Sequence, residues 1–454
     1  MKAMIAGAGQ VGIALAKYLR TENHDVVLID SDKTPLGHLA EQLDIQTIVG
    51  SASSPAVLER AGAEDVDVFL AVTGNDETNI LACCLAKSMF HISKRIARLN
   101  SAEYLVPKYA DFLKELSVDV VVSPEIETAT RVMAEVSISG AVDVASLAND
   151  QVQFIGLKCR KNCALVGKTV IEIRRLIGDV NFSILAVRRK NQLIDLTDVP
   201  VRAGDEVYIL VASGHLERVL DIFGYTYTPP KSVLIFGGGH VGFQLARMLE
   251  KADVHNVTLI EKSEAQAKFL AEHLKETLVL YGDGFDDVLL DDINFSSYQM
   301  AIATTQSDED NILLSLLAKR NGMERTCALI HNDLYKNYMQ GLGVDSLIDP
   351  DSVMVSSILQ HLRKGRVQGG YFLQSGLGEI LEVSVLKTAK ITRGPLDKIK
   401  IPDGIVLGGV IRNGVFIRPN QDLIVQEGDT VFVFVATGHV ADAEKLFTVE
   451  LSFF

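Results

Sequence analysis

The sequence predicts an α/β protein with two Rossmann-like, doubly wound parallel sheets, each followed by a small α+β module. Short apolar runs of strand length alternate with amphipathic helical segments, which is typical of a parallel sheet covered on both faces. A turn with the spacing Gly-x-Gly-x-x-Gly follows the first apolar run. The whole arrangement recurs roughly 230 residues later, which indicates an internal duplication of the order A-B-A-B.

The first glycine-rich turn lies between the apolar run 3–6 and a helical segment that begins at residue 13. Its first glycine permits a tight turn, its second lets backbone N–H groups approach a pyrophosphate, and its third lets the helix pack against the strand. The next apolar run ends in an acid, which accepts hydrogen bonds from ribose hydroxyls and repels a 2′-phosphate, so NAD is favoured over NADP. The residues predicted to bind a dinucleotide are Gly7, Ala8, Gly9, Gln10, Val11, Gly12 and Asp30.

The second glycine-rich turn follows the apolar run 233–236 and has the same spacing. Its predicted binding residues are Gly237, Gly238, Gly239, His240, Val241, Gly242 and Glu261. In both halves the alternative is a turn that shapes the fold without a ligand. That alternative weighs more in the second half, because duplicated domains often keep a fold and lose a site.

Further candidate binding residues follow the other strands, near the point where the strand order reverses and ligands bind. In the first half these are Ser51 after the third strand, Thr73 and Gly74 after the fourth, and Arg98 on the fifth, where a guanidinium suits a phosphate. The alternative for Thr73 and Gly74 is simple turn chemistry. In the second half the candidates are Asp283, Thr304 and Thr305, and the position of Arg98 is taken by an apolar residue. We therefore expect the two clefts to bind ligands unequally, with the first the better dinucleotide site.

The first Rossmann unit is predicted to have six strands and five helices in alternation. The strands are expected at 3–6, 26–30, 46–49, 68–72, 95–99 and 118–122, and the helices at 13–19, 35–43, 55–61, 75–88 and 103–116. One more helix begins at Ser123-Pro124-Glu125, with an N-cap serine and a proline in the first position. This helix is either a connector or dimer element, or a helix packed on its own domain, and its pattern favours neither.

Short strands predominate in the module that follows, at 153–157, 183–188, 192–194 and 206–212, before a helix at 216–223 and a linker at 225–230. The second half repeats this pattern, with 427–436 parallel to 203–212. The predicted domains are a Rossmann unit at 1–123, a module at 140–225, a second Rossmann unit at 231–347 and a second module at 367–452.

Composition excludes several classes of protein. A net charge of −14 argues against nucleic acid as a partner, because that affinity needs clustered Lys and Arg. No apolar run approaches the ~20 residues of a membrane-spanning helix. An odd count of five cysteines without paired spacing argues against a disulfide scaffold or structural zinc, so we expect packing cysteines and no metal site. The basic run 363–366 is expected to be a solvated face, or else a contact with an acidic surface or anionic lipid.

Several stretches of the sequence resemble the RCK, or KTN, family of ligand-binding regulators of potassium transport. The resemblance covers nearly the whole chain and rests on the first glycine turn, on Val72-Thr73 followed by Asp76-Glu77-Thr78-Asn79, and on the stretches 95–98 and 359–365. It implies a cytoplasmic subunit without enzymatic activity that gates a membrane potassium channel or transporter from the cytoplasmic face of the inner membrane. It also implies NAD(H) as ligand, ATP or ADP as regulatory ligands, and self-association into a ring, as a homotetramer.

Two other functions are weighed against this one. An NAD-dependent oxidoreductase needs a substrate domain that places a proton donor or acceptor against the nicotinamide. The small modules are short for that purpose, and no His-Asp, Lys-His or Tyr-Lys constellation stands out in the sequence. A redox-sensing DNA-binding repressor needs a helix-turn-helix and a basic face, and neither is visible in this acidic chain.

Overall fold

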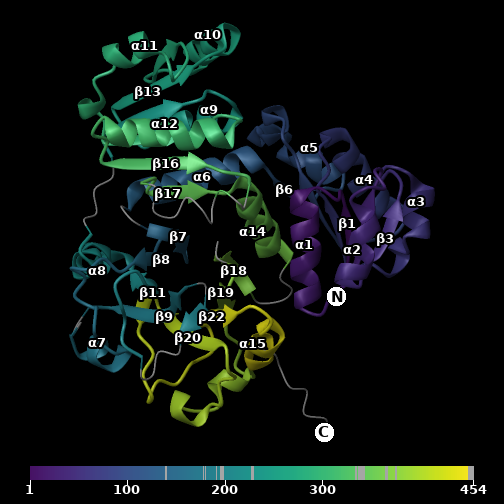
Figure 1. The fold of residues 1–454 in the computed structure, drawn as a ribbon. Coiled ribbons are helices and arrows are strands. Elements are labelled where there is room, and N and C mark those ends of the chain that lie inside the picture. The colour runs from purple at the N-terminus through teal and green to yellow at the C-terminus, as the bar shows by residue number, and fades with distance from the viewer. Residues whose placement is uncertain are drawn as a thin grey trace.

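The computed structural model describes residues 1–138, 141–176, 178, 180–190, 192–194, 199–225, 230–332, 335, 343–362, 367–373 and 376–447. In Figure 1 the first Rossmann unit lies to the right, the second at the top, and the two small modules together below. The basic run 363–366 and most of the linker at 225–230 lie outside the described residues.

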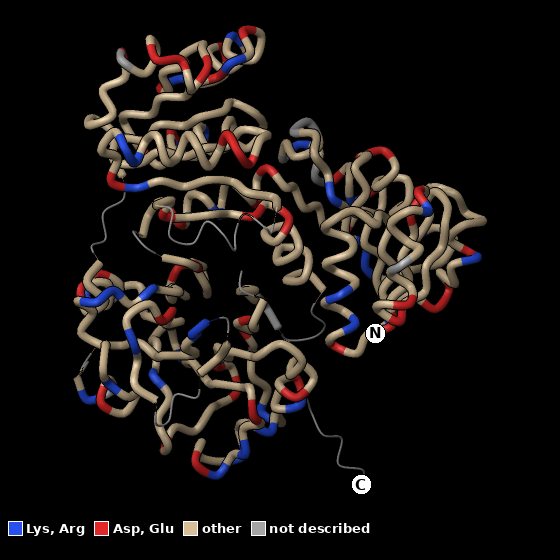
Figure 2. The backbone as a smooth tube through the Cα atoms, viewed as in Figure 1, with Lys and Arg blue, Asp and Glu red and all other residues tan. Residues whose placement is uncertain are grey.

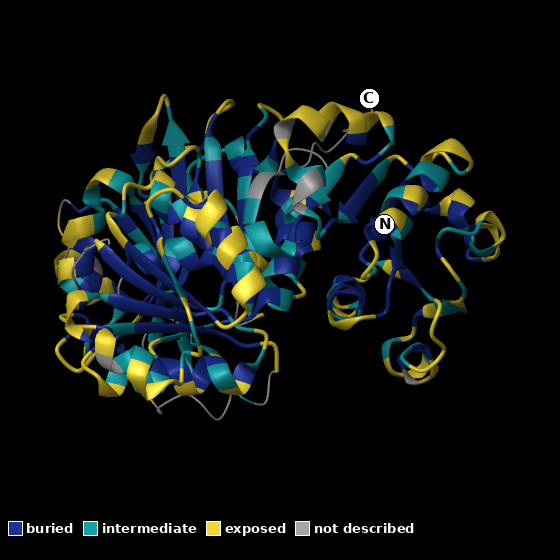
Figure 3. Ribbon diagram, turned by 90° about the horizontal axis from the view of Figure 1, so that it is seen from above, coloured by how far each residue is buried: buried dark blue, intermediate teal, exposed yellow. Residues whose placement is uncertain are grey.

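The first Rossmann unit is a six-stranded sheet that is parallel throughout, as the alternating pattern predicts, and its strand order is β3-β2-β1-β4-β5-β6. Its inner strands are largely buried because helices cover both faces of the sheet, and all of 68–71 is buried, whereas the edge strand 46–49 has no buried residue; Figure 3 shows the strands at the centre of each unit. The strands are β1 (Lys2–Ala6), β2 (Asp25–Asp30), β3 (Gln46–Val49), β4 (Val68–Ala71), β5 (Lys94–Arg98) and β6 (Val120–Val122). The helices are α1 (Gln10–Thr21), α2 (Leu36–Leu43), α3 (Pro55–Arg60), α4 (Asp76–Ser88) and α5 (Ala110–Glu115).

The second Rossmann unit repeats this order as β14-β13-β12-β15-β16-β17. Its strands are β12 (Ser232–Phe236), β13 (Asn256–Glu261), β14 (Leu278–Tyr281), β15 (Met300–Ala303), β16 (Arg325–Leu329) and β17 (Ser346–Ile348). Its helices are α9 (His240–Lys251), α10 (Glu264–His273), α11 (Asp287–Asp292) and α12 (Asp308–Arg320). The two-Rossmann fold class predicted from the sequence is thereby confirmed.

Each small module is a five-stranded antiparallel sheet with helices beside it. The first contains β7 (Ala141–Leu147), β8 (Val152–Lys158), α7 (Val170–Leu176), β9 (Phe182–Arg189), β10 (Gln192–Ile194), β11 (Glu206–Ala212) and α8 (Leu216–Phe223). The second contains β18 (Val367–Phe372), β19 (Gly378–Ser384), β20 (Ile405–Arg412), β21 (Val415–Ile417), β22 (Thr430–Ala436) and α15 (Val440–Phe447). The two sheets share one apolar core, in which the rings of Phe154 and Tyr371 lie 5.2 Å apart.

The two helices that leave the Rossmann units are exchanged between them. Helix α6 (Pro124–Ser137) follows the first unit but buries Val132 and Val136 in the core of the second, against α9. Helix α14 (Pro350–Leu362) follows the second unit but buries Ile358 and Leu359 in the core of the first, beside α1. Helix α6 is thus not packed on its own domain but connects the two Rossmann units within the chain.

A buried polar network fixes α6 where the modules meet. Arg131 on α6 donates to Glu135 Oε1 at 3.0 Å and to the carbonyl of Val142 on β7 at 3.0 Å. Asp143 accepts from Arg131 and, at 2.8 Å, from the hydroxyl of Tyr371 in the second module. The buried charges of Arg131, Glu135 and Asp143 are thus paired with one another. Through these contacts α6, which packs on the second Rossmann unit, is also joined to both modules.

One predicted helix is wrong in extent. The segment 103–116 forms 3₁₀ turns at Ala102–Leu105 and Pro107–Tyr109, and an α-helix only at Ala110–Glu115. Pro107 lacks a backbone N–H and restricts the residue before it, so a helix cannot run through this position. The predicted module does begin at 140, but neither β7 nor α7 was expected, since the first predicted strand was that at 153.

Candidate functional site

The first glycine turn is shaped by the steric demands of its three glycines. Gly7 has φ +112°, and a Cβ there would lie 2.9 Å from the carbonyl oxygen of Val72. A Cβ on Gly12 would lie 1.8 Å from the carbonyl oxygen of Gly7, so helix and strand are in backbone contact. A Cβ on Gly9, by contrast, would meet nothing within 4 Å. Packing within the protein therefore explains Gly7 and Gly12, whereas Gly9 leaves open space at the start of α1.

The second turn follows the same rule. Gly237 has φ +101°, and a Cβ on Gly242 would lie 2.0 Å from the carbonyl oxygen of Gly237, while a Cβ on Gly239 would meet nothing within 4 Å. Gly9 and Gly239 are the N-caps of α1 and α9, and neither helix receives a hydrogen bond from a capping side chain. Their first-turn N–H groups thus face open space, which is the arrangement that binds phosphate.

The two acids that end the second strands hold these turns in place. Asp30 Oδ2 accepts from the backbone N–H of Ala8 at 2.6 Å, and Glu261 Oε2 accepts from that of Gly238 at 2.7 Å. The other oxygen of each carboxylate accepts from the N–H two residues further along, at 2.8 Å in both halves. Both acids therefore lie beside the turns, as a ribose-binding carboxylate must, and also brace the backbone that would approach the pyrophosphate.

Two buried asparagines at the switch points were not predicted as site residues. Asn79 accepts from the hydroxyl of Thr73 at 2.7 Å and donates to the carbonyl of Arg98 at 2.8 Å. Asn311 makes the matching bonds, accepting from the hydroxyl of Thr305 at 2.7 Å and donating to the end of β16 at 3.0 Å. Each asparagine ties the end of the fourth strand to the end of the fifth. The repeated spacing Thr-x₅-Asn is the sequence signal that would have found them.

This pairing makes Thr305 the structural counterpart of Thr73. Thr304 has a different task, because its buried hydroxyl donates to the carbonyl of Gly237 at 2.8 Å and so supports the glycine turn. Ser51 is exposed and shares a hydrogen bond with Ser53 at 2.7 Å, and a Cβ on Gly74 would meet nothing within 4 Å.

A cavity of about 940 Å³ joins the second glycine turn to the first Rossmann unit. Predicted residues of the second half that line it are Gly237, Gly239, His240, Val241, Glu261, Asp283, Thr304 and Thr305; Gly238 and Gly242 are not among its lining residues. From the first half, it is lined by Val11, Arg98, Pro124, Glu125 and Thr128. Arg98 was expected to serve the first cleft, but the structure places it in a cavity with the second turn.

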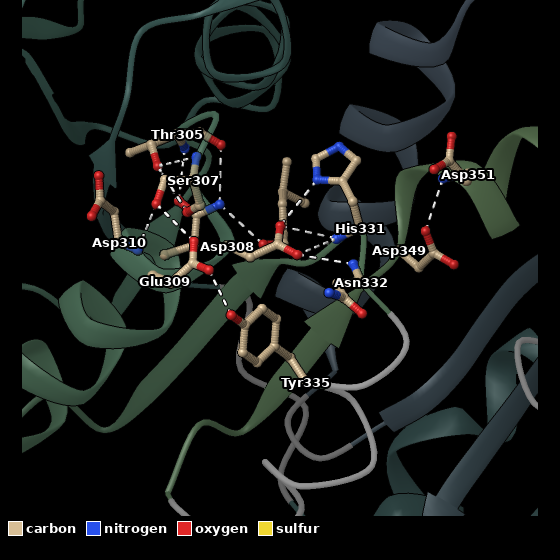
Figure 4. Close-up of polar contacts among 12 residues, drawn as sticks. Thr305, Ser307, Asp308, Glu309, Asp310, His331, Asn332, Tyr335, Asp349 and Asp351 are labelled. Carbon is tan, nitrogen blue, oxygen red and sulfur yellow. Dashed lines mark hydrogen bonds and ion pairs between the residues drawn. The ribbon is translucent and has the colours of Figure 1, made fainter. Parts of the chain in front are cut away.

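A histidine–carboxylate pair that the sequence did not reveal lies beside this cavity, which His331 lines. Figure 4 shows Asp308 at the start of α12, accepting from the backbone N–H groups of His331 and Asn332 at 3.0 and 2.9 Å. Its Oδ1 lies 3.1 Å from His331 Nδ1. Burial by itself raises the pKa of Asp308, but these hydrogen bonds outweigh it and hold the pKa below its usual value. In the first half, Asn100 bonds Asp76 in the same way, at 3.1 Å.

Both halves of the chain match protein families that are already known. The TrkA-N domain model matches residues 3–124 and 233–350, and the TrkA-C domain model matches 157–224 and 380–448. The chain is 35% identical to the Trk system potassium uptake protein TrkA of Azorhizobium caulinodans, over all of both chains. The chain belongs to the TrkA family. It is also 34% identical to the TrkA protein of Haemophilus influenzae, over 98% of both chains.

A solved structure shares the TrkA-family fold seen here. The GsuK channel bound to NAD superposes with a TM-score of 0.61 at 18% identity, covering 98% of this chain and 78% of that one. At this identity the likeness concerns the fold alone. It extends over both Rossmann units and both modules, so the whole A-B-A-B arrangement has a structural counterpart.

Proposed function

We propose that this chain is a nucleotide-binding regulatory subunit of a Trk-type potassium uptake system. It would gate a membrane channel or transporter subunit of the TrkH or TrkG type through a ligand-dependent conformational change. The observation that carries this proposal is the cavity in which the glycine turn of one Rossmann unit faces Arg98 of the other. A ligand that contacts both units binds differently to their alternative arrangements, and that difference shifts the conformational equilibrium.

The ligands we propose are NAD(H), with ATP or ADP as regulatory ligands. Support comes from the open N-termini of α1 and α9, which suit a phosphate, and from Asp30 and Glu261, which suit ribose hydroxyls and disfavour a 2′-phosphate. The structurally similar GsuK channel was solved with NAD bound.

We place the protein on the cytoplasmic face of the inner membrane, as a ring-forming homotetramer. None of the helices in the described part of the chain is long and apolar enough to cross a bilayer. Figure 2 shows Lys and Arg interspersed with Asp and Glu along the described chain, a distribution that favours a protein partner over nucleic acid. The exchanged helices α6 and α14 would carry a change in one cleft to the opposite unit.

Alanine replacement of Arg98 tests the shared cavity. We expect Arg98→Ala to weaken NADH binding at the second cleft about tenfold, the effect of losing one charge-assisted hydrogen bond of about 1.5 kcal/mol. Calorimetric titrations in Gly9→Ala and Gly239→Ala backgrounds would report each cleft separately, with the exposed Arg175→Ala as control. If Arg98→Ala weakened NADH binding only at the first cleft, Arg98 would be a binding residue of that cleft, and the support for a ligand shared by both units would be removed.

The alternative, an NAD-dependent oxidoreductase, gains one observation from the pairing of Asp308 with His331, which lines the cavity. Such a pair supplies a proton donor or acceptor in hydride-transfer enzymes. The matching bond between Asn100 and Asp76 in the first half favours a positioning role, since an amide cannot act as an acid–base catalyst. Titration of His331→Ala with NADH, together with a screen for hydride turnover, separates the two. Turnover that is lost in this variant would establish the enzyme.

A further inference from the structure

Two of the five cysteines lie in contact within the first module. Cys159 follows strand β8, and Cys163 follows a turn closed by its own N–H, which donates to the carbonyl of Arg160 at 3.0 Å. The two Sγ atoms are 3.7 Å apart, and both thiols are free. A disulfide needs a separation of about 2.0 Å, so a small movement of the turn would join them. The sequence spacing alone did not indicate this pair.

The chemical surroundings make the two thiols unequal. The hydrogen bond between the two sulfurs lowers the pKa of Cys163, and backbone N–H groups at Leu165 and Val166 and the charge of Lys168 act in the same direction. The same hydrogen bond and burial raise the pKa of Cys159. Thiolate, not thiol, is the nucleophile in oxidation, so Cys163 is the attacking member and Cys159 the resolving one.

A cavity lies beside one member of the pair, although both thiols are buried. Cys159 lines a space of about 570 Å³ between the first module and the second Rossmann unit. Arg160 and Lys161 line the same space and make this wall of it basic. Cys163 is not among the residues that line this space, and both cysteines pack in the apolar core of the first module. Cys83 and Cys327 are buried as well, but their pKa values are raised chiefly by burial, whereas the pKa of Cys163 is lowered.

We propose that Cys159 and Cys163 form a reversible intramolecular disulfide when hydrogen peroxide reaches them from the side of this cavity. The Cys163 thiolate attacks the peroxide, breaking its O–O bond, so that a sulfenic acid forms on Cys163 and hydroxide leaves to be protonated to water. The Cys159 thiol then attacks the sulfenic sulfur and gives up its proton, the disulfide bond forms, and a second water leaves. The two sulfurs lose two electrons, and the peroxide gains them.

The disulfide would act on the joint between the module and the linker that follows it. The turn between the cysteines carries Arg160, whose guanidinium lies over the ring of Tyr225 at 4.2 Å. The hydroxyl of Tyr225 donates to the carbonyl of Lys158 at 2.6 Å. Tyr225 is the residue at which the module passes into the linker to the second Rossmann unit. Oxidation would therefore stiffen this joint without altering either glycine turn.

Peptide mapping of the full chain tests the proposal. After treatment with hydrogen peroxide and blocking of free thiols, trypsin cleaves at Arg160 and Lys161, so a Cys159–Cys163 disulfide joins two separate peptides. We expect this linked pair to appear at least ten times faster than any oxidation of Cys83 or Cys327, and to disappear with dithiothreitol. Linked peptides distributed at random among the five cysteines, or oxidation at the rate of Cys327, would overturn the proposal.

Single variants test the assigned roles. In Cys159→Ser, we expect sulfenic acid to accumulate on Cys163, where a dimedone-type reagent traps it. In Cys163→Ser, Cys159 should remain unmodified, and trapping on Cys159 instead would reverse the assignment. If either variant fails to fold, the map of the unaltered chain still decides whether the disulfide forms. None of these readouts depends on nucleotide binding, so the result stands apart from the proposed regulatory function.

Discussion

Gly9→Ala is expected to weaken NADH binding at the first cleft about 100-fold, or about 2.8 kcal/mol, while the melting temperature stays unchanged. A Cβ at Gly9 has open space in the free protein, so folding is unaffected. The same methyl group would occupy the space through which a pyrophosphate approaches the N-terminus of α1. Calorimetric titration, together with thermal unfolding of the same samples, separates binding from stability.

Three matched variants complete this test. Gly239→Ala should abolish the second site and spare the first, and Gly12→Ala should reduce both binding and stability because its Cβ would overlap the carbonyl of Gly7. Gly214→Ala, at a site in the first module with equally open space, should change neither. If Gly9→Ala bound NADH as tightly as the unaltered chain, with unchanged stoichiometry, the first turn would be architectural.

Ile358→Ala should destabilise the first Rossmann unit by about 3 kcal/mol, although the residue follows the second unit in sequence. Its side chain is fully buried in the core formed by β1, β2 and α1, so truncation leaves a cavity there. Hydrogen exchange should show faster exchange in β1 and β4, with β12 and β15 little changed.

The mirror-image variant and a surface control sharpen this result. Val132→Ala on α6 should loosen β12 and β13 in the second unit, by a smaller amount because fewer methyl groups are removed. Leu313→Ala, on the exposed face of α12, should cost less than about 0.5 kcal/mol. Faster exchange confined to the unit that precedes each helix in sequence would contradict the exchange of α6 and α14.

The strands, the glycine turns and the duplication were predictable because their signals are local. A continuous apolar run, a glycine spacing and an acid at a strand end each constrain only a few neighbouring residues. The extent of α5 was also within reach, since Pro107 stands inside the expected helix. The correspondence between Thr73 and Thr305 was predictable as well, because an asparagine follows each threonine at the same distance in the sequence.

The features that connect the units were not predictable, because they depend on tertiary packing. The apolar stripe of α6 is the same whether it packs on its own unit or on the other. Arg98 was assigned to the first cleft by its strand, yet it lies in a cavity formed by both units. The pairs His331–Asp308 and Cys159–Cys163 were found only when their elements were placed in space.

Hydrogen exchange on Gly239→Ala, with and without NADH, tests most directly whether a nucleotide in one cleft acts on the opposite half. In this variant only the first cleft, at the N-terminus of α1, can bind NADH. Helix α1 packs beside α14, and its Tyr18 hydroxyl donates to Glu379 of the second module at 2.9 Å. We expect NADH to slow exchange in α1, and also in α14 and β19. Slower exchange confined to the first Rossmann unit would contradict coupling through the exchanged helices.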